Sequence, residues 1–292
     1  MVITVASGKG GTGKTLVATS LAVSLPGPRQ AQLLDCDVEE PNAHIFLGPR
    51  MDDVQPVYVP TPTVDEARCT LCRKCADVCA YHAIAVIVDK VLVFSELCHG
   101  CGACSYFCPE KAISEVGREI GVVETGLAGT IAFVQGRLKI GEPMATPIIR
   151  AVKGKMDRSK TVIIDASPGT SCPVVEAVEG SDFCLLVTEP TPFGLSDLTI
   201  AVEMVRKLGV PHGVIINRDG SGDEGVERFC ASENIPILLR IPFERRIAEL
   251  YSRGITLAEG LRGWRSAFRH LAEDIESIVP KASLGVDKGR AS

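Results

Sequence analysis

The chain has 292 residues, of which 46 % are hydrophobic and only 5 % aromatic, and its formal net charge is −5. This length allows one large domain and a smaller one. The acidic balance, without a long basic run, argues against general binding to nucleic acid. The longest apolar stretches fall short of the roughly 18 residues of a membrane span, so we expect no membrane insertion.

The chain opens with a β-branched run, Val2 to Ala6, followed by a glycine-rich segment and by apolar residues at helical period over Leu16–Leu25. Strand, loop and helix in this order are the context that a phosphate-binding loop requires. Residues 8–15 satisfy the pattern G-x-x-x-x-G-K-[ST]. We expect Lys14 to neutralise the β- and γ-phosphate oxygens of ATP or ADP, and Thr15 to hold Mg²⁺. The backbone N–H groups that would bind the phosphates belong to Gly8, Gly10, Gly11, Thr12, Gly13, Lys14 and Thr15.

Further apolar strands are predicted at 32–35, 131–134, 161–165, 183–188, 213–217 and 237–241. Helical patterns in the second half of the chain cover 194–208, 222–234, 244–253 and 258–278. Continuous apolar strands that alternate with helices predict an α/β fold. Its sheet should be mostly parallel and covered by helices on both faces.

Most of the 12 cysteines lie in two copies of the pattern C-x2-C-x2-C-x3-C, which start 29 residues apart. This is the spacing by which bacterial ferredoxins hold [4Fe–4S] clusters, with the fourth cysteine of each run binding the other cluster. The sequence therefore predicts two [4Fe–4S] clusters. The expected ligand sets are Cys69, Cys72, Cys75 with Cys108, and Cys98, Cys101, Cys104 with Cys79.

Two other interpretations of the cysteines are less favoured. Disulfides suit small secreted domains, but the chain starts directly with the strand and carries no signal-peptide pattern, so we expect a cytoplasmic protein. Zinc sites usually use two separated C-x2-C pairs rather than runs of four cysteines. The remaining cysteines Cys36, Cys184 and Cys230 are expected to be core residues.

A proline-rich stretch at 56–62 and a glycine-rich stretch at 117–129 bracket the cysteine region, where the strand–helix alternation stops. We interpret residues 61–116 as an inserted small α+β domain of the bacterial ferredoxin type. Residues 1–60 and 117–282 would then form a discontinuous P-loop ATPase domain, and residues 283–292 a flexible tail.

Lys9 makes the glycine-rich loop more specific, because Gly-Lys-Gly-Gly-Thr-Gly-Lys-Thr resembles the deviant Walker A loop of the MinD/ParA/Mrp and nitrogenase iron-protein class. The resemblance implies that Lys9 reaches across a dimer onto the partner's nucleotide. The segment 34–42 resembles the first switch of that class. This implies that Asp37 contacts the attacking water and that Asp35 helps to order the metal shell.

Other segments extend the resemblance toward the C-terminus. The strand ending at Asp165, with Ala-Ser-Pro-Gly after it, resembles the Walker B strand and second switch, which places Asp165 near Mg²⁺ through water. Asn217 matches the adenine-contacting position, and Pro242 the backbone beside the base. Cys172 follows Asp165 by seven residues, as a cluster ligand does in the nitrogenase iron protein. It would either share a metal across a dimer axis or pack under the second switch.

From Val2 to about Leu257 the chain resembles MinD-superfamily ATPases with an inserted ferredoxin domain. This resemblance implies Mg²⁺-dependent ATP hydrolysis and a dimer formed with itself or with a related ATPase. We expect nucleotide-driven dimerisation to be coupled to electron transfer, or to iron–sulfur or metal-cofactor assembly, on a partner protein. The alternative is an ATP-dependent positioning or scaffold protein, in which the clusters sense redox state or stiffen the insert.

Overall fold

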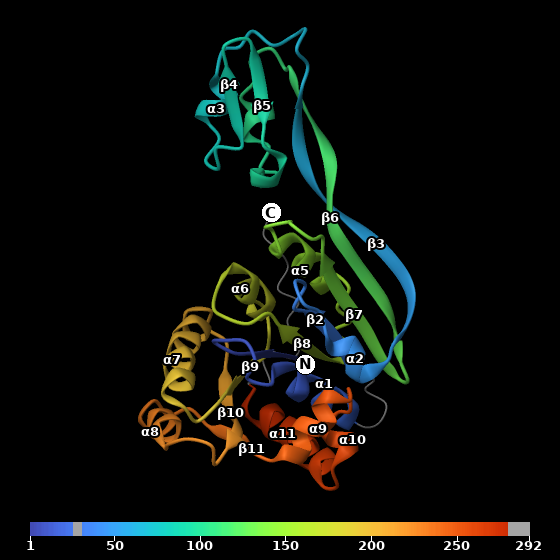
Figure 1. The fold of residues 1–292 in the computed structure, drawn as a ribbon, viewed down its shortest axis with the longest axis vertical. Coiled ribbons are helices and arrows are strands. Elements are labelled where there is room, and N and C mark those ends of the chain that lie inside the picture. Colours follow the sequence, from blue (N-terminus) through green and yellow to red (C-terminus); the bar gives the residue numbers. More distant parts are fainter. Residues whose placement is uncertain (26–30, 280–292) are drawn as a thin grey trace.

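The computed structural model describes residues 1–25 and 31–279 (Figure 1). The tail expected at 283–292 lies outside these residues. In the described part, one nine-stranded sheet has the order β11-β10-β9-β1-β8-β2-β7-β6-β3. Every pair of neighbours from β11 to β7 is parallel, which confirms the predicted mostly parallel sheet. These strands are β1 (Val2–Ala6), β2 (Ala31–Cys36), β7 (Ile131–Leu138), β8 (Thr161–Ala166), β9 (Phe183–Thr188), β10 (His212–Asp219) and β11 (Ile237–Pro242).

Helices cover both faces of this sheet, and each face has its own hydrophobic cluster. One cluster holds α1 (Lys14–Ser24), α2 (Ala43–Leu47), α9 (Arg245–Ser252), α10 (Leu257–Gly260) and α11 (Trp264–Ile278). The other holds α5 (Thr146–Lys153), α6 (Cys172–Val178), α7 (Pro192–Lys207) and α8 (Gly225–Ser232). Successive strand residues serve opposite faces, as Leu33 and Leu34 do. The pattern at 258–278 forms two helices, because Gly263 adopts a left-handed conformation with φ 91°.

Two long antiparallel strands, β3 (Arg50–Val64) and β6 (Ile113–Ala128), complete the sheet. They contain the proline-rich and glycine-rich stretches, which the sequence did not predict as strands. β3 lies at the sheet edge. Pro56, Pro60 and Pro62 of β3 are separated by even numbers of residues, so their backbone nitrogens point to the same side of the strand. This side faces away from β6, where the missing N–H groups cost no hydrogen bond of the ladder. In β6, a Cβ on Gly121 would lie 2.3 Å from the Arg137 carbonyl oxygen, which explains the glycine.

The ribbon β3–β6 forms an arm that projects from the body and carries the cysteine region (Figure 1). Only the part of β6 from Gly121 onward also pairs with β7. The arm begins where Val57 pairs with Gly121 and Tyr58 with Glu119, which leaves Ile120 as an extra bulge residue. At its far end Val64 pairs with Ile113.

The insert on this arm contains α3 (Lys74–Asp77), the hairpin β4 (Ile84–Ile87) and β5 (Lys90–Val93), a short 3-10 turn at Ser95–Leu97 and α4 (Ala103–Tyr106). Its backbone repeats itself. Residues with positive φ occur in pairs 29 positions apart: Leu71 and Gly100, Arg73 and Gly102, His82 and Lys111. The two halves therefore share one loop geometry, as expected for a duplicated unit. The hydrophobic cluster of the insert is small: its buried members among the described residues are Cys75, Ile84 and Cys104.

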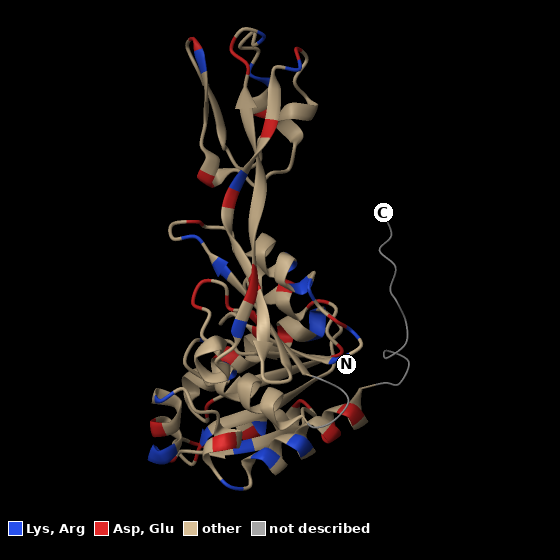
Figure 2. Ribbon diagram, turned by 90° about the vertical axis from the view of Figure 1, so that its right-hand side faces the viewer, with Lys and Arg blue, Asp and Glu red and all other residues tan. Residues whose placement is uncertain are grey.

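Acidic and basic residues are interspersed over both the body and the insert (Figure 2). Charge therefore does not divide the molecule into an acidic and a basic half. Within residues 1–25 and 31–279, none of the helices is both long enough and apolar enough to cross a bilayer.

Candidate functional site

The glycine-rich loop lies between β1 and α1, at the carboxyl end of the parallel strands. Gly13 adopts φ 99° immediately before α1 and Gly11 adopts φ 77°, conformations that favour glycine. A Cβ on Gly8 would lie 2.3 Å from the Asp197 carbonyl oxygen, and one on Gly13 would lie 2.4 Å from Asn217 Nδ2. The glycines are therefore needed both for the turn and for close packing against α7 and β10.

A cleft opens beside this loop and encloses about 1140 Å³ of space, its open mouth included. Residues predicted to bind nucleotide that line it are Gly10, Gly11, Gly13, Lys14, Thr15, Asp37, Asn217 and Pro242. Gly8, Lys9, Thr12, Asp35 and Asp165 are not part of this wall. The cleft also contains Arg218, Tyr251 and Asn42, which sequence reasoning missed. They come from β10, from α9 and from the residue before α2, and their approach to the P-loop depends on the tertiary fold.

Asp165, next to the cleft, is a buried carboxylate whose oxygens lack hydrogen-bond donors in the described part of the chain. It is 1 % exposed, and within the described residues neither carboxylate oxygen has a hydrogen bond of normal geometry. Burial raises the pKa of Asp165 to about 7, although the Thr15 hydroxyl and the charge of Lys14 act to lower it. Buried carboxylate oxygens without donors, next to Thr15, form a ligand set that suits Mg²⁺. The residues present therefore fit the predicted metal.

Asp37 and Lys14 influence each other across the cleft. Burial raises the pKa of Asp37 to about 6, and the charge of Lys14 opposes this shift. Burial also lowers the pKa of Lys14, against the charges of Asp165 and Asp37. Lys14, Asp37 and Asp165 thus form a cluster of one positive and two negative groups. A bound magnesium–phosphate group would add both signs of charge to this cluster.

Asp35 occupies a different place from Asp37. It is fully buried, and burial, followed by the charge of Asp165, raises its pKa well above the usual range. Its Oδ1 accepts a hydrogen bond from the Asp37 N–H at 3.1 Å, and its Oδ2 accepts from Asn42 at 3.1 Å and Ala43 at 3.0 Å. Asp35 therefore holds the loop that carries Asp37. Its predicted contribution to the metal shell stays a prediction.

Lys9 lies near a carboxylate of its own chain. Its Nζ is 3.7 Å from Glu189 Oε2, and Arg218 binds the other oxygen of Glu189 at 2.8 Å. Glu189 is only 8 % exposed and follows the end of β9. Sequence reasoning assigned no role to Glu189. Its position after a buried strand of a parallel sheet was the available signal.

Asn217 connects the P-loop to the end of β10. Its side-chain Nδ2 donates to the Thr12 carbonyl oxygen at 2.7 Å, and its Oδ1 accepts from the Arg218 N–H at 2.9 Å. Pro242 ends β11 and lies beside Phe243, whose side chain is exposed. Contact of Asn217 and Pro242 with a base stays a prediction.

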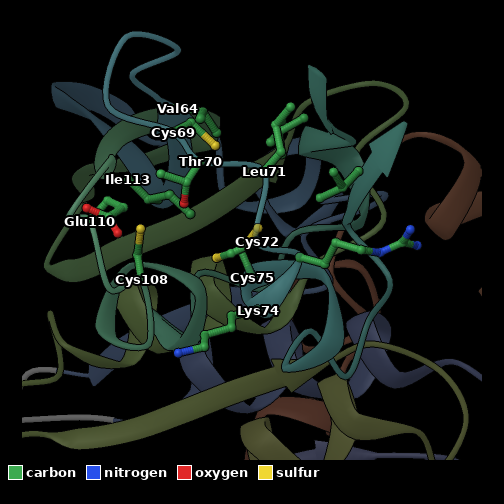
Figure 3. Close-up of a pocket in the computed structure, with 13 residues that line it drawn as sticks. Val64, Cys69, Thr70, Leu71, Cys72, Lys74, Cys75, Cys108, Glu110 and Ile113 are labelled. Carbon is green, nitrogen blue, oxygen red and sulfur yellow. The ribbon is translucent and has the colours of Figure 1, made fainter. Parts of the chain in front are cut away.

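Two cavities of similar size in the insert collect its cysteines. One, of about 360 Å³ with its open mouth included, is lined by Cys69, Cys72, Cys75 and Cys108, whose side chains converge around a common space (Figure 3). The other, of about 350 Å³ measured in the same way, is lined by Cys79, Cys98, Cys101 and Cys104. The structure thus brings together the members of each ligand set that the spacing predicts.

The two cysteine cavities lie at different positions along the arm. Val64 and Ile113, at the far end of the arm, line the first, which we call the distal cavity. Pro62 and Glu115 line the second, and Cys98 Sγ lies 3.9 Å from the Pro60 carbonyl oxygen. Because Pro60 is nearer to the body along β3, we call this the proximal cavity.

The sulfur environment fits bound clusters. Backbone N–H groups donate to sulfur from Ala83 to Cys79 at 3.2 Å and from Ala112 to Cys108 at 3.3 Å. Such hydrogen bonds stabilise thiolate ligands. Among the described residues, no three His, Cys, Asp or Glu side chains are placed to hold one metal ion. A [4Fe–4S] cube needs a different geometry, because its four cysteines each bind a separate iron and do not converge on one ion.

The other cysteines fall into two groups. Cys36, Cys184 and Cys230 are buried, in agreement with the prediction of core residues. Cys172 is exposed at the start of α6, so the interpretation that it packs under the second switch is wrong. The exposed position follows from the polar turn that precedes α6. A metal shared across a dimer axis is not tested by this placement.

Comparison with known proteins places the chain among nucleotide-binding proteins. An uncharacterised protein of Methanocaldococcus jannaschii is 30 % identical over 87 % of this chain and 90 % of its own length. The iron-sulfur cluster carrier protein of Pyrococcus abyssi is 24 % identical over 96 % of this chain and 85 % of its own length.

Among solved structures, the septum site-determining protein MinD of Pyrococcus horikoshii, complexed with Mg-ADP, matches with a TM-score of 0.57 at 20 % identity. The match covers 96 % of this chain and 99 % of that one. At this identity the match supports the fold alone. The family profile of the CobQ/CobB/MinD/ParA nucleotide binding domain matches residues 3–257. The chain therefore belongs to the CobQ/CobB/MinD/ParA nucleotide-binding family.

Proposed function

We propose that this chain is a Mg²⁺-dependent ATPase whose nucleotide state controls delivery from a two-cluster insert to a partner protein. What is delivered is either electrons or an iron–sulfur or metal cofactor. Family membership supports nucleotide turnover, and the two cysteine cavities support the clusters. The observation that carries the coupling is a short backbone connection between the first switch and the base of the arm.

This connection consists of two hydrogen bonds. Val38, next to Asp37, accepts one from the Leu138 N–H at 2.8 Å. The next residue, Lys139, donates to the carbonyl oxygen of the bulge residue Ile120 at 2.9 Å. A movement of Asp37 toward a γ-phosphate would therefore act on the root of the arm through adjacent backbone groups. Switch segments that respond to a γ-phosphate commonly transmit their movement in this way.

At the cleft, the chain's own residues would share the work of hydrolysis. Lys14 would neutralise the phosphate oxygens, and Thr15, with Asp165 behind it, would hold Mg²⁺, which adds positive charge at the phosphates. Asp37, facing the cleft, would orient the attacking water. Lys9 would leave Glu189 and reach the nucleotide of a second subunit, either a copy of this chain or a related ATPase.

At the insert, the cysteines of the two cavities would bind the clusters, which supply one-electron transfer when present. Because the cavities lie in series along the arm, the proximal one is nearer to the switch connection. The distal one lies where a redox or cofactor-accepting protein has freer access. We propose this activity for a reducing cytoplasm, in which cysteines bind metals rather than form disulfides.

The test is the rate of electron transfer from the reduced clusters to a viologen acceptor, measured anaerobically with and without Mg·ATP. We expect ATP to change this rate severalfold in the native protein and to have no effect in Lys14→Ala. Equal rates in all four samples would contradict the coupling. If ATP changed only the assembly state, the positioning or scaffold function would be favoured instead.

A further inference from the structure

Arg118 joins the arm to the body. It lies on β6 just before the bulge, and both terminal nitrogens of its guanidinium bind Glu142, in the loop between β7 and α5. The second of these bonds, from Nη2 to Oε1, is 3.2 Å long. The side chains are 21 % and 5 % exposed. This is a sheltered, two-point ion pair with a fixed geometry rather than a mobile surface contact.

The same arginine lies beside the wall of the proximal cavity. Across the arm, Arg118 pairs with Val59. On the other side of Val59, a Cβ added to Gly100 would lie only 2.8 Å from the Val59 Cγ1. Gly100 in turn donates its N–H to Cys98 Sγ at 3.5 Å. Val59 and Gly100 thus connect the strand position opposite Arg118 to a predicted cluster ligand.

The charge and hydrogen bonding of Arg118 support a relation to that ligand. Its pKa is raised, first by the hydrogen bond to Glu142 and further by the charges of Glu96 and Cys98. Its Nε–H is buried and has no acceptor among the described residues. The guanidinium therefore lies within electrostatic range of the proximal cavity while its hydrogen bonds fix it to Glu142.

We propose that Arg118 is a positioning and tuning residue that raises the reduction potential of the cluster in the proximal cavity, while the distal cluster is unaffected. This inference rests on the proposed function, because it requires that the cavity holds a cluster. A fixed positive charge in a sheltered site stabilises the reduced form, which carries one more negative charge. Glu142 opposes this effect electrostatically while it holds the guanidinium in place.

The test is a redox titration of the anaerobically purified full chain, followed by electron paramagnetic resonance. We expect Arg118→Gln to lower the equilibrium constant for one-electron reduction at one site about tenfold, which corresponds to 59 mV. Glu142→Gln removes a negative charge from the same place and should shift the same potential upward. Arg118→Lys keeps the charge and should restore most of the native value.

Two arginines elsewhere provide controls. Arg150 binds Glu176 between α5 and α6 through one, more exposed bond and lies far from the arm in the chain, so Arg150→Gln should leave both potentials unchanged. Arg73 lines the distal cavity. Arg73→Gln should therefore change the reduction potential of the distal cluster, which Arg118→Gln should leave unchanged.

The outcomes separate this inference from the proposed function. If the native protein held far fewer than about eight irons per chain, the two-cluster function itself would fail. With both clusters present, unchanged potentials in Arg118→Gln would overturn the assignment. It would also be overturned if Arg118→Gln and Glu142→Gln shifted the potential in the same direction, or if Arg118→Gln lost iron. Either result would mean that the pair only maintains structure.

Discussion

The body and the insert are stabilised in different ways. In the body, a large hydrophobic cluster on each sheet face buries aliphatic residues of nearly every strand and helix. In the insert, the described core contains Cys75, Ile84 and Cys104, two of which are predicted iron ligands. A unit this small buries a smaller share of its surface than the body does, so its stability from burial alone is marginal. Burial therefore stabilises the nucleotide-binding body, whereas the insert would gain its stability from the proposed clusters.

Removal of iron should produce the largest effect and should separate the two regions. If the proposed clusters stabilise the insert, chelation should abolish its resistance to proteolysis between residues 65 and 112, while the body stays folded and binds nucleotide. Limited proteolysis with mass spectrometry would locate the cleavage sites. An insert that stayed protected without iron would contradict the contrast drawn here.

Lys9→Ala should affect the body alone. A cation supplied in trans contributes on the order of 10³-fold to phosphoryl transfer, so we expect a loss of that size in steady-state ATP hydrolysis, with the iron content unchanged. The exposed Lys207, at the end of α7, provides the control Lys207→Ala, which should hydrolyse ATP normally. Retained turnover in Lys9→Ala would argue against a closed-dimer mechanism.

Alanine substitutions of two glycines of β6 would compare how tightly the body and the arm are packed. A Cβ on Gly121 would lie 2.3 Å from the Arg137 carbonyl oxygen and 2.4 Å from Ile148 Cδ1. Gly121→Ala should therefore lower the free energy of unfolding of the body by about 1–3 kcal/mol.

Gly117→Ala is the matched substitution in the arm. Its Cβ would meet the half-exposed side chain of Tyr58, at 3.3 Å from Cδ1 and 3.4 Å from Cβ. These distances are longer than those at Gly121, so we expect a cost below about 1 kcal/mol. Thermal unfolding of both variants with iron bound would measure the difference. Equal losses would indicate that arm and body are packed equally tightly.

The charge cluster of the cleft predicts a pH dependence of the stability of the body. Because burial raises the folded-state pKa of Asp37 from 3.8 to about 6, its ionised form costs stability at neutral pH, and this cost declines as the pH falls from about 6 toward 3.8. Asp37→Asn should therefore stabilise the nucleotide-free body at pH 7, on the order of 1–2 kcal/mol, and weaken the gain in stability between pH 7 and pH 5.

Chemical denaturation at several pH values would test this prediction. Asp274→Asn, on the exposed face of α11, is the control and should change stability by less than about 0.5 kcal/mol. An unchanged pH profile in Asp37→Asn would show that Asp37 does not carry the predicted cost.

The parallel core could be predicted from the sequence because strands such as Phe183–Thr188 are apolar throughout, a pattern that only a sheet buried on both faces requires. The cysteine sets could be predicted because their spacing reflects cluster geometry directly. β3 and β6 could not, because their prolines and glycines are typical of loops. The edge position of β3 and the backbone packed against Gly121 exist only in the folded chain.

The same limit applies to the candidate site. Lys14, Thr15 and Asp37 belong to local motifs, so each was identifiable by position in the sequence. The pairs Lys9–Glu189 and Arg118–Glu142 join segments that are distant in the sequence or separated by a strand. Opposite charges are common on any surface, so no pattern distinguished these pairs from others.

The most direct test of the central claim is amide hydrogen exchange at Leu138 and Lys139, whose N–H groups connect the first switch to the arm. Binding of Mg²⁺ with a non-hydrolysable ATP analogue should slow exchange at both amides in the native protein and leave Lys14→Ala unchanged. If exchange slowed in the glycine-rich loop but stayed the same at Leu138 and Lys139, the nucleotide would not reach the arm, and the proposed coupling would be contradicted.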